Sequence, residues 1–237
     1  KNYILLNFGG ESMLKVTYFG HSAFRLFDGS TTVLIDPFLS HNPAAKMNPE
    51  DVTADYIILT HAHGDHLGDA LAIARQHDAT IIAVYELANY CASKGIKTHD
   101  MHIGGGYNFK FGRVKFTIAH HGSSTPDGAY MGSPAGAVIT IGGKNVYHCG
   151  DTGLFYDMKL IGEMTPIDLM LVPIGDNYTM GVDDAVKAVE LANPKCVVPM
   201  HYNTFDVIKA DASDFGKKLE GINKKSIIMK CGETIEI

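Results

Sequence analysis

The sequence lacks the features that would place a chain in a membrane or fasten it with disulfides. None of its apolar runs approaches the about 18 residues needed to cross a bilayer, and no secretory-type apolar segment precedes a cleavage site. The four cysteines are far apart and form no CxxC pair, which disfavours zinc ribbons and redox pairs. We therefore expect a cytoplasmic protein with four reduced thiols, at Cys91, Cys149, Cys196 and Cys231.

Charges and motifs typical of several other function classes are also missing. Lys and Arg number 20 against 26 Asp and Glu, for a formal net charge of −6, and no basic run or basic-aromatic array occurs. Nucleic acid is therefore disfavoured as a partner. The glycine run at 104–106 lacks the Lys-Ser/Thr of a phosphate-binding loop, and no Gly-x-Ser-x-Gly elbow is found. We expect a small-molecule substrate and no membrane partner.

What remains is the composition of an ordinary globular chain. Its 237 residues are 46% hydrophobic and 19% charged, and no Pro-, Gly- or Ser-rich linker divides them, so we expect a single domain. Residues 1–12 precede Met13, where an alternating strand begins. We interpret 1–12 as an added or alternative start that could supply an edge strand, and 13–237 as the domain. Both a monomer and a homo-oligomer fit these data.

Hydrophobic periodicity predicts an α/β fold. Each half of the chain runs from a strand meander into alternating helices and strands, so the simplest packing is a four-layer αββα sandwich of two mixed sheets with helices outside. A hairpin turn is expected around Gly112 and Arg113. Helices are predicted at 67–77, 86–94, 155–163, 183–192 and 212–219, and strands at 14–19, 23–27, 32–35, 56–59, 80–84, 107–111, 114–119, 137–141, 145–148, 169–173, 196–199, 226–229 and 234–237.

The densest chemical signal is the sequence THAHGDH at 60–66. It places three imidazoles and a carboxylate directly after a buried strand, where ligand groups often gather. Gly64 lets the chain bend, so that Asp65 and His66 can face a second position. The alternative is a polar loop in which Asp65 caps the next helix, but a cap requires no histidines. The pattern favours a metal site.

Three later motifs also follow predicted strands: AHHGS at 119–123, CGDT at 149–152 and PMHY at 199–202. In this order, the four motifs resemble those of the metallo-β-lactamase superfamily. Imidazoles and carboxylates are ligands of zinc, iron or manganese, and a carboxylate between two cations offsets their repulsion. The resemblance implies one metal on His61, His63 and His121, a second on Asp65, His66 and His201, and a bridging Asp151.

His120 and His121 cannot both reach the metals, because successive side chains of a strand point to opposite faces. The superfamily pattern, in which a small residue or serine follows the ligand, favours His121. His120 is then expected to have a structural or supporting role.

A closer resemblance is to small single-domain metal-dependent hydrolases of this superfamily, a group similar to the ascorbate-phosphate lactonases. Its matching segments are 18–22, 35–38, 101–105, 173–177 and 201–204. Asp36 resembles the carboxylate that orients a ligand imidazole, with a plain turn as the alternative, and His21 could support the site or be purely structural. Residues expected to bind substrate or support the ligands are His21, Asp36, His102, His148, Asn177 and Asn203.

The resemblance also implies a reaction. Two divalent ions, zinc first with manganese or iron as alternatives, would hold a bridging hydroxide that attacks a carbonyl or phosphoryl centre, with Asp65 as the catalytic carboxylate. Lactones, esters, amides and phosphodiesters are all candidate substrates, and the charge of the ions could attract an anionic one. The alternatives are di-iron reduction of oxygen or peroxide, for which no electron-delivering domain is present, and a non-catalytic metal-binding protein.

Overall fold

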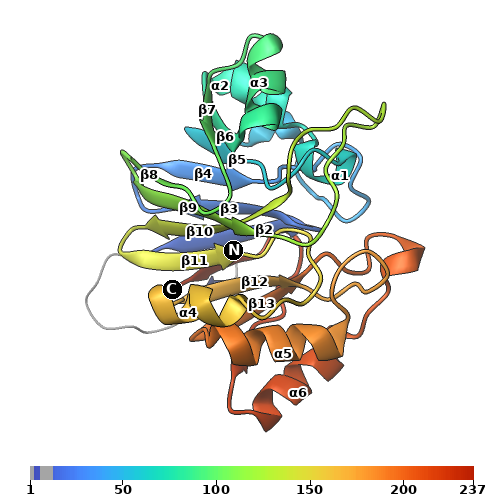
Figure 1. Cartoon of the computed structure of the whole chain (residues 1–237). Helices are drawn as coiled ribbons and strands as arrows, with labels where there is room; N and C mark the ends of the chain where they lie inside the picture. The colour runs from blue at the N-terminus through green and yellow to red at the C-terminus, as the bar shows by residue number, and fades with distance from the viewer. Residues whose placement is uncertain (1–2, 6–12) are drawn as a thin grey trace.

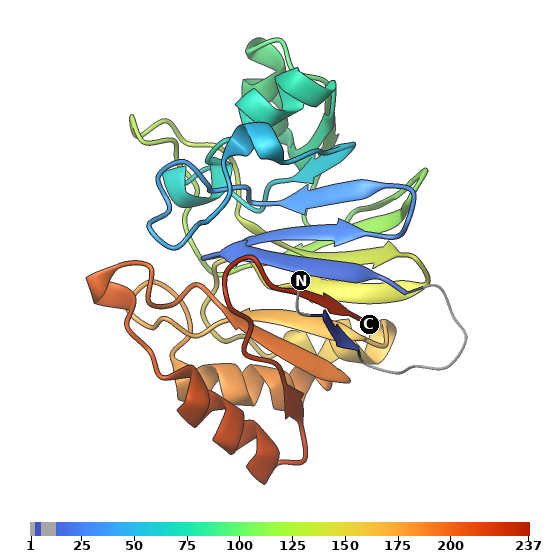
Figure 2. The same ribbon diagram turned by 180° about the vertical axis from the view of Figure 1, so that it is seen from behind.

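Two β-sheets dominate the computed structural model, which describes residues 3–5 and 13–237 (Figure 1, Figure 2). The first sheet has eight strands in the order β1-β15-β2-β3-β4-β5-β6-β7 and the second has seven in the order β14-β13-β12-β11-β10-β9-β8. Strands of the first sheet are β1 (Tyr3–Leu5), β2 (Lys15–Gly20), β3 (Ala23–Phe27), β4 (Thr32–Ile35), β5 (Tyr56–Ile58), β6 (Thr80–Val84), β7 (Thr98–Met101) and β15 (Thr234–Glu236). Those of the second are β8 (Gly106–Phe109), β9 (Gly112–Ile118), β10 (Ala135–Ile141), β11 (Lys144–His148), β12 (Leu169–Pro173), β13 (Cys196–Met200) and β14 (Lys225–Ser226).

Helices cover the outer faces of both sheets. The α-helices are α1 (Gly64–Leu67), α2 (Ala70–His77), α3 (Tyr85–Ser93), α4 (Met158–Met164), α5 (Val182–Ala192) and α6 (Ala212–Gly221), and Pro49–Asp51 and Asp206–Ile208 form 3₁₀ turns. Helices α2 and α3 pack on β5, β6 and β7, while α5 packs on β12 and is flanked by α4 and α6 (Figure 1). The predicted four-layer αββα sandwich is confirmed.

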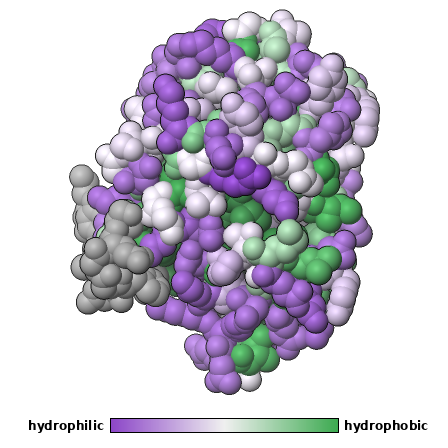
Figure 3. All heavy atoms as spheres, turned by 60° about the vertical axis from the view of Figure 1, so that its left-hand side comes forward, coloured by the Kyte–Doolittle hydropathy of each residue, from purple (hydrophilic) through white to green (hydrophobic). Residues whose placement is uncertain are grey.

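The inner strands are apolar along their whole length because they are covered on both faces. Every residue of β12 and β13 is buried, as are Ile57 and Ile58 of β5. On the face shown in Figure 3, the side chains at the surface are mostly hydrophilic, with smaller apolar groups among them. The rigid apolar strands therefore hold the polar residues at their ends in fixed positions.

Two predicted elements differ in detail. The predicted helix at 67–77 is divided at Gly68, whose φ is 41°; a Cβ there would lie 2.6 Å from the Pro37 carbonyl oxygen, so the chain turns where two backbones meet. The hairpin turn expected around Gly112 and Arg113 was wrong, because Phe109 pairs with Gly112 and the turn falls on the two residues between them.

Two observations bear on the expected surroundings of the protein. Among the described residues, no helix is both long and apolar enough to span a membrane. Its cysteines are free thiols, with Cys91, Cys149 and Cys196 buried and Cys231 half-buried.

From the segment interpreted as an added start, Tyr3–Leu5 forms β1, the edge strand that pairs with β15 in parallel. The rest of 1–12 lies outside the described residues.

Candidate metal centre

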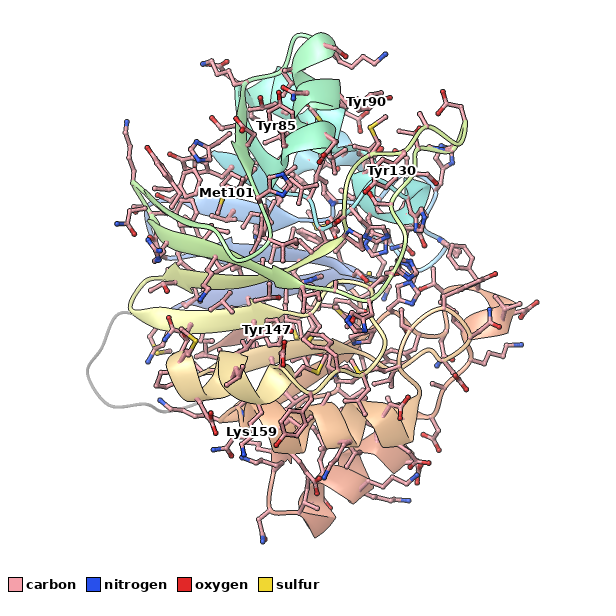
Figure 4. All side chains as sticks on the ribbon, viewed as in Figure 1. Tyr85, Tyr90, Met101, Tyr130, Tyr147 and Lys159 are labelled. Carbon is pink, nitrogen blue, oxygen red and sulfur yellow. The ribbon has the colours of Figure 1, made fainter. Side chains whose placement is uncertain are left out.

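Loops at the ends of four strands bring the predicted ligands to one place. Residues 60–66 follow β5, and the other three predicted ligands follow β9, β11 and β13. The loop between β9 and β10, which carries the exposed Tyr130, passes beside α1 (Figure 4); Pro126 of this loop would lie 3.5 Å from a Cβ on Gly64. All seven predicted metal ligands converge, although they come from both sheets.

Three histidines form the first group. Nδ1 of His63 lies 3.0 Å from Nε2 of His61 and 3.3 Å from Nε2 of His121. Four-coordinate zinc with Zn–N bonds of about 2.0–2.1 Å separates its ligand atoms by roughly 3.3 Å. The three ring nitrogens therefore have the spacing of ligands on one ion. Asp151 approaches from one side, with its Oδ2 3.6 Å from His121 Nε2.

A second group contacts the same oxygen of Asp151. Oδ2 of Asp151 is 2.9 Å from His201 Nε2 and 3.2 Å from His66 Nε2. Asp65 joins these histidines through His21, whose Nε2 is 3.1 Å from Asp65 Oδ2. One potential ligand atom from each of His21, Asp65, His66 and His201 lies within 4.8 Å of the others. Asp151 thus contacts both groups, in the place expected of a bridging carboxylate.

Asp36 fixes which nitrogen of two rings carries the proton. This fully buried carboxylate, 24 residues before Thr60, accepts hydrogen bonds from the Thr60 hydroxyl at 2.6 Å, the Thr60 amide at 2.9 Å and His66 Nδ1 at 2.7 Å. Because the hydroxyl proton points to Asp36, Thr60 Oγ1 accepts from His61 Nδ1, 3.0 Å away. Both His61 and His66 therefore direct a lone pair on Nε2 into the centre.

The electrostatics match the protonation states that metal binding requires. Burial lowers the pKa of His61 well below its ordinary value and lowers the pKa of His63 and His121 as well, so these rings are neutral. Burial opposes ionisation of Asp151, but His201 and His66 outweigh it and hold the pKa of Asp151 well below its usual range. Neutral imidazoles and ionised carboxylates are the forms that bind metals.

The pKa values of Asp65 and His66 are shifted in opposite directions. Burial would raise the pKa of Asp65, but the hydrogen bond with His21 and the charge of His66 hold this pKa well below its usual range. Burial would lower the pKa of His66, but Asp151 and Asp36 raise it well above the ordinary value. Two carboxylates thus favour positive charge at His66, which is the charge that a bound cation would supply.

The residues present fit divalent cations. Three buried polar atoms of the cluster have no hydrogen-bond partner: His66 Nε2, His201 Nδ1 and Asp151 Oδ1. His66 Nε2 is near Asp151 but is not aligned for a hydrogen bond with it. Unpaired buried polar atoms are costly and rare, and ring nitrogens that face one another as acceptors are stabilised by a cation between them. Left-handed backbone at Asp36 and His201, with φ of 45° and 53°, adds strain of a kind found at functional sites.

The two adjacent histidines have different surroundings. His121 contacts His63 and Asp151, whereas His120 is exposed and its ring lies against Phe155, with centroids 5.2 Å apart. Its backbone amide donates to the Thr152 hydroxyl at 2.9 Å. Of the pair, His121 is therefore the one that the fold turns toward the cluster.

The remaining predicted residues have varied positions. His148 is buried and fully hydrogen-bonded: Nε2 donates to the Ser22 carbonyl at 3.0 Å, and Nδ1 accepts from the Gly150 amide at 3.1 Å. Burial lowers the pKa of His148, so it is a neutral ring that ties the β2–β3 turn to the loop carrying Asp151. It supports the site from inside the protein.

Asn203 uses its side chain within its own loop, since its amide nitrogen donates to the Ala210 carbonyl at 3.1 Å and its oxygen accepts from the Ala210 amide at 3.0 Å. Asn177 is exposed in the loop after β12, with φ of 48°. His102 is exposed in the turn after β7. None of the three belongs to the clusters of potential metal ligands found among the described residues.

Sequence reasoning missed the two threonines that orient site histidines. Thr60 links Asp36 to His61, and Thr204 lies 2.9 Å from His21 Nδ1 through its hydroxyl. Thr60 immediately precedes the first ligand and Thr204 follows His201 closely, so nearness to a ligand was the available signal. Nothing in the sequence assigned either hydroxyl to a particular ring.

Comparison with known proteins agrees with this architecture. A family model described as a beta-lactamase superfamily domain matches residues 31–202. A UPF0173 metal-dependent hydrolase of Carboxydothermus hydrogenoformans is 50% identical over 94% of this chain and 99% of its own length. This chain belongs to the metallo-β-lactamase superfamily. Within it, the chain is a metal-dependent hydrolase of the UPF0173 family, as its motifs predicted.

Other relatives extend the agreement over nearly the whole chain. The UPF0173 metal-dependent hydrolase of Pelotomaculum thermopropionicum is 49% identical over 94% of this chain and all of its own. Among solved structures, Igni18, a metallo hydrolase from the archaeon Ignicoccus hospitalis, has a TM-score of 0.89 and 39% identity, covering 95% of this chain and 98% of that one. The metallo-β-lactamase fold therefore includes the loops that carry the candidate metal centre.

Proposed function

We propose that this metal-dependent hydrolase uses two divalent ions to cleave a carbonyl or phosphoryl bond of a small molecule. His61, His63 and His121 would hold one ion, Asp65, His66 and His201 the other, and Asp151 would bridge them. The observation that carries the proposal is the convergence of these residues from four strand ends, with Nδ1 of His61 hydrogen-bonded to Thr60 and Nδ1 of His66 to Asp36. We keep zinc as the first choice of ion, with manganese or iron as alternatives.

When bound, the ions supply Lewis acidity and lower the pKa of water from 15.7 towards about 7. The protein determines where that chemistry occurs. Asp36 and Thr60 hold the His61 and His66 rings in the required tautomers, and the Ser123 hydroxyl accepts from the Ala62 amide at 3.2 Å, which braces the loop between His61 and His63. Such preorganised support keeps ligands in a productive geometry.

Asp65 is placed to move a proton. Its side chain is 28% exposed, against 3% for Asp151, so one face of this carboxylate is open to solvent and substrate while His21 holds the other. Its low pKa keeps it ionised, so that it can accept a hydrogen bond from an attacking water. We therefore propose Asp65 as the general base, and as the donor of that proton to the leaving group.

A hollow beside the centre could receive the substrate. It has a volume of about 320 Å³ and is lined by Phe38, Ser40, His41, Gly64, Leu67, Gly68, Asp69 and Pro126. Gly64 lies between two proposed ligands, so this hollow adjoins the loop that carries them. Its size suits a small molecule, and the charge of two ions would favour an anionic one. With its four free thiols, the enzyme is best suited to the cytoplasm.

The test is hydrolysis of a panel of lactones, esters, amides and phosphodiesters by the purified protein, before chelation, after chelation and after restoring zinc, manganese or iron. Turnover that is lost on chelation and returns with metal supports the proposal. Reduction of oxygen or peroxide by the iron-loaded protein, without hydrolysis, would favour the di-iron alternative. Metal binding with neither activity would instead indicate a non-catalytic metal-binding protein.

A further inference from the structure

We infer that His21 is a fourth protein ligand of the ion proposed for Asp65, His66 and His201. This inference rests on the proposed two-metal function and adds a residue from the β2–β3 turn to the second site. It also makes the two sites unequal. The first would have three imidazoles and Asp151, and the second would have three imidazoles and two carboxylates.

The backbone fixes His21 beside the centre. Its carbonyl accepts from the Tyr18 hydroxyl at 3.1 Å and from the His201 amide at 2.9 Å, and its φ is 57°. The ring is buried, with 1% exposure, and its centroid lies 4.1 Å from that of His201. A strained and buried histidine whose carbonyl is bonded to a proposed ligand has little freedom to turn away from the site.

One tautomer of His21 directs the lone pair of Nε2 into the centre. His21 Nδ1 lies 2.9 Å from Thr204 Oγ1, and this hydroxyl is itself 3.5 Å from the Tyr202 carbonyl, which can only accept. When His21 Nδ1 carries the ring proton, Thr204 Oγ1 accepts it and turns its own proton toward the Tyr202 carbonyl. His21 Nε2 then presents a lone pair to Asp65 Oδ2, 3.1 Å away.

Two acceptors at that distance repel each other unless a proton or a cation lies between them. The same arrangement recurs at His66, which donates from Nδ1 to Asp36 and faces Asp151 with Nε2. A single ion close to His21, Asp65, His66 and His201 stabilises every one of these lone pairs, and these residues already have ligand atoms within 4.8 Å of one another. A proton on His21 would stabilise only its contact with Asp65.

A five-donor site has a consequence for metal choice. Four-coordinate zinc suits the first group, whereas three imidazoles and two carboxylates suit an ion that takes five or six ligands, such as iron(II) or manganese(II). The second ion would have little coordination space left for substrate. With four protein ligands instead of five, the first ion is the one expected to have room for substrate, by expanding to five-coordinate.

Crystals of the wild-type protein loaded with zinc or manganese, with anomalous scattering at the metal edge, give the direct test. We expect an ion about 2.1 Å from His21 Nε2. An ion on Asp65, His66 and His201, with His21 Nε2 hydrogen-bonded to Asp65 instead, would overturn the inference and leave the proposed function intact. A second site without any ion would overturn both.

Metal titration of chelator-stripped variants tests the same point in solution. His21→Ala should lower the affinity for the second ion by more than the about 10–100-fold that loss of a supporting partner costs. Thr204→Val, which keeps the His21 ring, should lower this affinity only within that range. His120→Ala serves as the matched control and should bind both ions as the wild type does. Equal losses for His21→Ala and Thr204→Val would show that His21 acts only as support, contrary to the inference.

Discussion

Replacing Asp36 with Asn should weaken metal binding without rearranging the backbone. Asn tolerates the left-handed conformation that Asp36 adopts at φ 45°, so the substitution changes the hydrogen bonds and the charge alone. Asp36 Oδ1 accepts from the Thr60 amide, while Oδ2 accepts from both the Thr60 hydroxyl and His66 Nδ1. An amide has one oxygen, so in either orientation at least one of these buried donors faces an NH₂ group.

The expected magnitudes follow from that geometry. One buried donor without an acceptor costs about 1–3 kcal/mol, so the free energy of unfolding of the metal-free protein should fall by about that amount. Loss of the carboxylate also makes the His66 and His61 rings poorer ligands, and removal of such a supporting partner typically weakens metal affinity by about 10–100-fold. Both effects should be found in the same variant.

Denaturant unfolding and metal titration against a competing chelator measure the two effects. Asp69→Asn is the matched control, because Asp69 accepts from the Leu39 and Ser40 amides at 2.8 and 2.9 Å and contacts no histidine of the centre. Its metal affinity should stay at the wild-type value. If Asp36→Asn loses stability but binds metal as tightly as the wild type, then Asp36 does not set the tautomers of His61 and His66, and the account of ligand orientation is wrong.

Three further predictions test other parts of the account. His121→Ala should lose one ion by metal analysis while His120→Ala keeps both; equal loss from the two would mean that the wrong histidine was chosen. Asp65→Asn should fold and keep the ion on the three histidines, yet turn over substrate about a hundredfold or more slowly, in line with a general-base contribution of roughly 10²–10⁴; near-normal turnover by a metal-replete variant would exclude that role. Unfolded, unreduced protein should titrate as four thiols, and in the native state at pH 8 Cys231 should react first and Cys91 far more slowly, because burial raises the pKa of Cys91 to about 12; a missing pair of thiols would indicate a disulfide.

The sequence predicted the sandwich because alternating and continuous apolar runs mark strands well, but polar strands and close approaches escape this signal. Strand β7 was not predicted, since its residues THDM have no apolar pattern and depend on pairing with β6. The break at Gly68 depends on the carbonyl of Pro37, a contact that no local pattern encodes. Both misses are effects of tertiary structure on a short segment.

The residues of the site likewise fall into those with a local sequence signal and those brought together only by tertiary structure. The convergence of the seven proposed ligands could be predicted because the spacing of the histidines and carboxylates is local within each motif and the motifs keep a fixed order. Asp36 and His21 were predicted as supports from the resemblance, but their partners Thr60 and Thr204 could not be, since each pair is far apart in the chain and meets only after folding. Asn203 resembled a substrate residue by motif, but its amide is occupied by Ala210.

Native mass spectrometry of chelator-stripped protein, titrated with zinc or manganese, counts the ions that the folded chain binds. We expect two ions, and we expect hydrolysis of whichever panel substrate is turned over to rise as the metal pair is completed. A chain that binds one ion or none under conditions where the substrate is hydrolysed would contradict the two-metal centre built on Asp151.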